Sequence, residues 1–203
     1  MKKIGAIVFS ALALTFMACG DKADAERQAK LLTDSAMNIV SVSSKSEDLQ
    51  QALTLLNAAI SKEPTYYLAH WNKLVIQNQL GLRDEAYQTL QTLEELRPKN
   101  PDLKATDGIF LLIKGDSVAA QKKFEVADKL FDEVLDTLHN INDPYQTIRI
   151  NKALNMRFMG KENEAQIMLD SIAKQQDNPT ILAFINQMKG LTKEQMVRQF
   201  GSR

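Results

Sequence analysis

The sequence has few of the residues that favour turns and strands. Only 8 glycines and 5 prolines occur in 203 residues, and aromatic residues make up 6% of the chain. Glycine and proline dominate turns, whereas aromatic residues favour strands. Their scarcity therefore indicates an all-α protein.

Two further shortages exclude classes of site. The single cysteine, Cys19, cannot form a disulfide bond within the chain or a metal site built from several thiolates. Basic and acidic residues number 25 each, so the formal net charge is zero. Because proteins that bind nucleic acid through phosphate contacts normally carry a basic surplus, we expect no nucleic-acid partner.

Residues 1–18 have the pattern of an export signal. Lys2 and Lys3 precede an uncharged run over residues 4–18. A membrane-spanning helix needs about 20 apolar residues, so this run is too short to span a bilayer. We predict a signal peptide over 1–18, with a buried N-terminal helix as the alternative.

Cys19 follows this apolar run directly, and residues 16–21 resemble a bacterial lipoprotein signal. In such signals the cysteine becomes the lipidated first residue of the mature chain, although Phe16 and Met17 depart from the usual smaller or aliphatic residues. The resemblance implies several acyl chains on Cys19, which anchor a protein stably where one chain does not. It implies a lipid-anchored domain of the cell envelope. We expect this domain at the outer membrane, facing the periplasm or the exterior, with attachment to the inner membrane as the alternative. A conventionally cleaved signal that leaves Cys19 as an unmodified thiol is the alternative.

A 34-residue repeat runs through the remaining chain. Each copy has an alanine followed four residues later by a large apolar residue, in the pairs Ala52–Leu56, Ala86–Leu90 and Ala120–Phe124. The same spacing relates Gly81 to Gly115 and Pro64 to Pro98. A fourth copy begins 45 residues further on, with Gly160, Ala165 and Leu169.

This spacing has a mechanical basis in paired helices. Residues four apart share one helix face, so the alanine admits a neighbouring helix and the larger residue fills the space beside it. Glycine after the first helix supplies a left-handed turn, and proline ends the second helix.

The repeat resembles the tetratricopeptide repeat, a unit of two antiparallel helices, over residues 33–178. The resemblance implies an α-solenoid of about four helix pairs, preceded by a lipid-anchored segment over 19–32 and followed by a capping helical tail over 179–203. We expect helices at 22–44, 47–62, 65–80, 83–96, 101–114, 117–139, 143–159 and 162–175.

Two stretches depart from the simple repeat. The fourth copy has 11 extra residues before it, and the apolar residues Leu130, Val134 and Leu135 continue the stripe of the preceding helix. We therefore expect one long helix that ends near His139. In the tail, Asn178 precedes Pro179 as a helix cap, and residues 192–195 read as a capping box.

Motifs for catalysis are absent from the sequence. His70 and His139 lie on different repeats, and no spacing typical of a metal site or glycine-rich phosphate loop occurs. We therefore predict no metal, no cofactor and no enzymatic activity. An enzyme whose site forms only on folding is the remaining alternative.

The tetratricopeptide resemblance implies that the first helix of each pair lines a concave, partner-binding face. The expected inward-facing residues are Trp71, Val75, Asn78, Ile109, Leu112, Ile150, Leu154 and Arg157. An apolar face with an aromatic anchor suits an extended or helical apolar segment, so we predict a membrane-anchored, non-catalytic adaptor or scaffold for another protein. The same residues could instead be core, covered by helix 22–44 or by the tail, or could bind a soluble ligand or a polymer.

Overall fold

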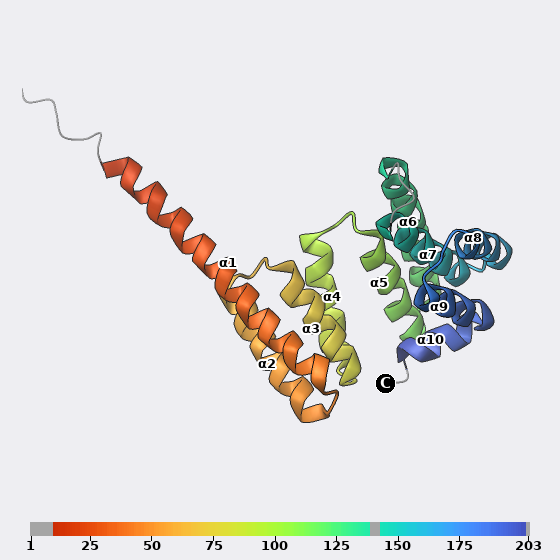
Figure 1. The fold of residues 1–203 in the computed structure, drawn as a ribbon, viewed down its shortest axis with the longest axis horizontal. Helices are drawn as coiled ribbons and strands as arrows, with labels where there is room; N and C mark the ends of the chain where they lie inside the picture. The colour runs from red at the N-terminus through yellow and green to blue at the C-terminus, as the bar shows by residue number, and fades with distance from the viewer. Residues whose placement is uncertain (1–9, 139–142, 202–203) are drawn as a thin grey trace, which may run out of the picture. The chain divides into compact units, whose positions relative to one another are not determined.

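The computed structural model describes the backbone over residues 10–138 and 143–201, and the side chains over 22–138 and 145–199. This part of the chain is all α-helical, with ten helices and no strand, as the sequence predicts (Figure 1). The helices are α1 (Ser10–Val42), α2 (Ser46–Lys62), α3 (Tyr67–Gln79), α4 (Arg83–Leu96), α5 (Pro101–Ile113), α6 (Ser117–Thr137), α7 (Asp143–Phe158), α8 (Glu162–Lys174), α9 (Pro179–Gly190) and α10 (Lys193–Gly201).

The chain divides into two compact units. Unit 1 comprises Met1–Thr89 and unit 2 comprises Leu90–Arg203, so that the boundary falls within α4. In unit 1, α2 packs against α1 and α3, and α1 also contacts α3. In unit 2, consecutive helices from α5 to α9 pack against one another in pairs, and α10 returns to contact α5.

The helix boundaries confirm the predicted ranges closely, with one difference at the N-terminus. Helix α1 begins at Ser10, whereas the sequence led us to expect a start at Lys22. The alanines and leucines of the apolar run are strong helix formers, so the helix extends through them. Helix α6 ends at Thr137, close to the predicted end, while His139 lies outside the described residues.

The anchors of the repeat occupy the positions that the spacing requires. Ala52, Ala86, Ala120 and Ala165 are all 0% exposed, and the large apolar residues four positions later are buried beside them. Gly81, Gly115 and Gly160 all have positive φ, between 72° and 86°. After each glycine, a backbone N–H bonds the carbonyl five residues earlier, which closes the helix in a left-handed turn.

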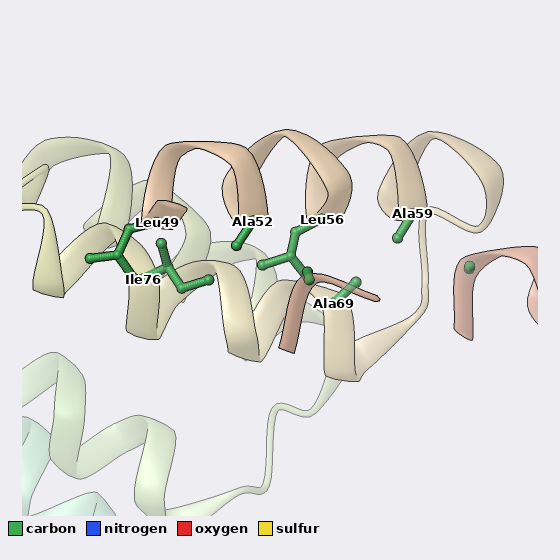
Figure 2. Close-up of a cluster of buried hydrophobic side chains, with 8 residues drawn as sticks. Leu49, Ala52, Leu56, Ala59, Ala69 and Ile76 are labelled. Carbon is green, nitrogen blue, oxygen red and sulfur yellow. The ribbon is translucent and has the colours of Figure 1, made fainter. Parts of the chain in front are cut away.

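The core of unit 1 lies between α1, α2 and α3. Figure 2 shows Leu49, Ala52, Leu56 and Ala59 of α2 facing Ala69 and Ile76 of α3. Ala29 and Ala36 of α1 complete this cluster. The small residues allow the helices to approach closely, and the leucines fill the remaining volume.

The core of unit 2 is centred on stacked aromatic rings. Phe124 of α6 and Phe158 of α7 have ring centroids 5.3 Å apart, and Met196 of α10 belongs to the same buried cluster. Phe131 of α6 is also fully buried. It extends the predicted α6 stripe, although the sequence pattern pointed to Leu130 and Val134, which are only partly buried.

The caps predicted for the tail are confirmed. The Asn178 side chain accepts hydrogen bonds from the Thr180 and Ile181 backbone N–H groups. The Thr192 N–H donates to Gln195 Oε1 at 2.7 Å, and the Gln195 N–H donates to Thr192 Oγ1 at 3.2 Å. This reciprocal capping box starts α10 and fixes its direction.

Candidate functional site

One face of α3 carries exposed apolar side chains. Val75 is 38% exposed and Leu68, seven residues before it, is 52% exposed. Trp71 lies between them on the same helix face and stacks on Tyr67, with centroids 6.4 Å apart and an interplanar angle of 15°. Trp71 and Asn78 are half-buried. The structure therefore brings together three of the predicted site residues, Trp71, Val75 and Asn78, on α3.

Leu68 belongs to this face, but the sequence analysis did not select it. It lies three residues before Trp71, a spacing that places two side chains on adjacent turns of a helix. The signal was present in the sequence, because residues 68, 71, 75 and 78 follow helical periodicity. We refer to Leu68, Trp71, Val75 and Asn78 together as the α3 face.

The predicted site residues of α5 and α7 lie in a different environment. Ile109 and Ile150 are buried, and Leu112 and Leu154 are partly buried. Ile109, Leu112 and Leu154 share a cluster with Leu191, Met196 and Val197 of the tail. These three residues therefore pack with the tail, which agrees with the alternative that they are core, whereas Ile150 packs with residues of α8 and α9.

The guanidinium group of Arg157 on α7 is also engaged in hydrogen bonds within unit 2. Its guanidinium donates to the backbone carbonyls of Met188 and Leu191, where α9 ends, and Nε donates to Glu162 Oε2 at 2.8 Å. The residue is 6% exposed. Its observed role is to satisfy the terminal carbonyls of α9 and hold the corner that leads into α10.

Buried ion pairs link the first helices of unit 2, a feature that the sequence analysis missed. Glu94 accepts from Lys104 at 2.7 Å and from Lys123 at 3.3 Å, and Lys123 also pairs with Asp107, which is 1% exposed. Burial alone would lower the pKa of Lys123, but Asp107 and Glu94 outweigh it, so the pKa is raised. The charges of two carboxylates and two ammonium groups thus balance, and these ion pairs link α4, α5 and α6.

Among the residues considered for chemistry, His70 has a structural role. His70 is buried and its Nε2 lies 2.8 Å from the carbonyl oxygen of Pro64, so that it bridges the α2–α3 turn. No group of three histidine, cysteine or acidic residues suited to a metal ion occurs among the described side chains. Cys19 and His139 lie outside the described side chains.

Comparisons with known proteins agree with this architecture. Residues 44–106 match the family model described as tetratricopeptide repeat. No curated protein matches the sequence. Within the described residues, no helix is both long enough and apolar enough to cross a membrane.

Three solved structures illustrate the structural likeness. PilW, a widely conserved type IV pilus biogenesis factor, is 17% identical with a TM-score of 0.56, covering 86% of this chain and 76% of PilW. YrrB, a tetratricopeptide protein with an unusual peptide-binding site, is 14% identical with a TM-score of 0.46, covering 84% and 82% of the two chains. A tetratricopeptide repeat protein from Parabacteroides merdae is 14% identical with a TM-score of 0.42, covering 93% and 94%.

The family match and the PilW likeness converge on one architecture. The matched segment contains α2, α3 and α4, which carry two of the alanine–leucine pairs and one left-handed glycine turn. PilW shares the fold over most of the chain. Residues 44–106 are thus similar to tetratricopeptide repeats, and the described residues of the chain form an all-α architecture of paired helices.

Proposed function

We propose that this protein is a lipid-anchored, non-catalytic adaptor of the bacterial cell envelope, which binds another protein through the α3 face. The observation that carries the proposal is the exposure of Leu68 and Val75 beside the stacked ring of Trp71. The similarity to the tetratricopeptide repeat supports a role in binding another protein, and PilW, a structure of similar fold, is a type IV pilus biogenesis factor.

The contrast between α3 and the first helices of unit 2 supports a binding role. On α5 and α7, Ile109, Leu112 and Leu154 share a buried cluster with Met196 of α10, and Ile150 packs in a second cluster with residues of α8 and α9. On α3 the apolar residues are left partly in water, which costs free energy unless a partner covers them. The exposed face therefore fits an apolar helix or extended segment, with Trp71 as the aromatic anchor.

The anchor is tested by replacing Cys19 with serine. We expect the wild-type protein to fractionate with membranes and to incorporate a labelled fatty acid, and the Cys19→Ser variant to do neither. Ser35→Ala, a change at an exposed serine of α1, serves as the control and should remain in the membrane fraction. Full membrane retention of Cys19→Ser would contradict the lipid anchor.

The α3 face is tested by site-specific photo-crosslinking in cells. A photoreactive amino acid at position 75 should yield an adduct with one defined protein, and Leu68→Glu should abolish that adduct because it places a charge in the apolar contact. The matched control places the photoreactive residue at Ile167 of α8, which is 71% exposed. Identical adducts from positions 75 and 167 would refute a specific surface.

A further inference from the structure

Unit 2 contains a cleft of about 580 Å³ that the proposed function does not use. It lies between the turn that joins α4 to α5, the end of α6 and the beginning of α7. Its apolar lining comes from Pro98, Pro101, Val134 and Ile148. A space of this size and character accommodates a side chain with an apolar stem.

One carboxylate, Asp102, lines this cleft and forms no ion pair with a described side chain. Its Oδ1 accepts a hydrogen bond from Asn151 Nδ2 at 2.9 Å. No ion pair to a described lysine or arginine reaches it, whereas Glu94 and Asp107 nearby in the chain are both paired. Asp102 is thus a half-buried negative charge that the described side chains leave uncompensated.

Local structure explains why this carboxyl group points away from its own helix end. Asn100 caps α5, since its Oδ1 accepts from the Asp102 and Leu103 backbone N–H groups at 2.9 and 3.3 Å. Pro101 occupies the first turn. Because the cap is already supplied, the Asp102 side chain is not needed there and reaches Asn151 on α7 instead.

Burial of the Asp102 carboxylate disfavours its ionised form. Burial raises the pKa of its carboxyl group, and the Asn151 hydrogen bond opposes that rise only in part. Arg97 and Lys99 also line the cleft, but both are exposed and neither counters the effect of burial on Asp102. A cation brought to Asp102 would interact in a less polar medium than bulk water and would therefore bind more strongly than at an exposed carboxylate.

We propose that this cleft binds a lysine or arginine side chain of a partner protein. The alkyl stem lies against Pro98, Val134 and Ile148, and the terminal cation pairs with Asp102. An acidic segment is the less favoured occupant, because Arg97 and Lys99 are exposed, and salt screens the attraction of exposed cations for a carboxylate. This surface is separate from the α3 face and does not depend on it.

The proposal is tested by fluorescence anisotropy with the full-length protein and a labelled hexapeptide of alanine and leucine that carries one central lysine. Norleucine in place of lysine keeps the stem and removes the charge. We expect the lysine peptide to bind about tenfold more tightly than the norleucine peptide. Asp102→Asn, which retains an oxygen for Asn151, should reduce lysine-peptide affinity to that of the norleucine peptide.

Matched variants test whether the lysine preference belongs to this cleft. Asp177→Asn removes an exposed carboxylate outside the cleft and should leave the affinity unchanged, as should Leu68→Glu on α3. Val134→Lys places a cation inside the cleft and should abolish the preference for lysine. Circular dichroism verifies that each variant is folded.

Several results would overturn the proposal. Equal affinity for the lysine and norleucine peptides would exclude a role for the charge, and a lysine preference retained in Asp102→Asn would exclude this carboxylate. Tighter binding of a glutamate peptide would assign the cleft to an acidic segment. Competition by free pentylamine at the peptide's own concentration would indicate a site for small amines, and no binding up to about 1 mM would exclude a functional site.

Discussion

Replacing Gly108 with alanine should destabilise unit 2, although alanine is the better helix former. Gly108 lies within α5, where the change from glycine to alanine normally stabilises by about 1 kcal/mol. An added Cβ, however, would lie 2.5 Å from Cε1 and 2.8 Å from Cδ1 of Phe124. Packing therefore predicts that Gly108→Ala lowers the free energy of unfolding, whereas helix propensity predicts that it raises it.

The position of the Phe124 ring decides which effect is larger. The ring is 1% exposed and stacks on Phe158 with an interplanar angle of 10°, so it has no open space into which to move. Ordinary contacts begin at 3.4 Å, so the 2.5 Å approach requires a displacement of about 0.9 Å. Overpacking of this kind costs about 2–3 kcal/mol, which leaves a net destabilisation of about 1–2 kcal/mol.

Urea unfolding followed by circular dichroism measures this difference. The double variant Gly108→Ala with Phe124→Leu should be more stable than the sum of the single changes predicts, because leucine relieves the overlap. Gly190→Ala, where no atom lies within 4 Å of an added Cβ, is the control and should not be destabilised. An increase in the stability of Gly108→Ala would refute the packing argument.

Three further predictions concern backbone strain, the tail and pH. Gly115→Ala should cost about 1–2 kcal/mol in urea unfolding through its φ of 86° alone, since no atom lies near an added Cβ; an unchanged midpoint would contradict this. Arg157→Met should cost about 3 kcal/mol, because it removes the side-chain donor from two carbonyl groups, one buried and one partly buried, and should expose residues 189–192 to limited proteolysis. Full protease resistance would argue against the role of Arg157. Asp102→Asn should raise the urea midpoint at neutral pH but not near pH 3. Burial raises the Asp102 pKa above its ordinary 3.8, so the ionised carboxylate disfavours folding at neutral pH. Near pH 3 the carboxyl group is mostly protonated in both the folded and the unfolded chain, and this effect is lost. A lower midpoint at neutral pH would mean that the carboxylate is stabilising.

Much of the fold was predictable because each helix pair is specified locally. The alanine–leucine spacing identifies the buried face, and the three glycines mark turns whose positive φ disfavours other residues. The helix cap at Asn178 and the capping box at Thr192–Gln195 were also predictable from the sequence, since their hydrogen bonds join residues only a few positions apart. These features depend on neighbours in sequence.

The candidate site was only partly predictable, because exposure depends on segments that are distant in sequence. Val75 of α3 and Ile109 of α5 both have the pattern of an apolar residue on a first helix, yet one is exposed and the other is buried. The difference arises from Met196 and Val197, which approach α5 only when the tail folds back. No periodicity within a single helix contains that information.

The sequence by itself determined most of the helices and the main faces by which they pair, because these follow from interactions over 34 residues or fewer. The tertiary structure alone decided which apolar faces are covered and which of the described charged side chains form ion pairs. Asp102 illustrates the physical reason: its burial and its bond to Asn151 require the contact of α5 with α7, 49 residues away in the chain. The energy of a charge depends on its complete surroundings, and only the folded chain supplies them.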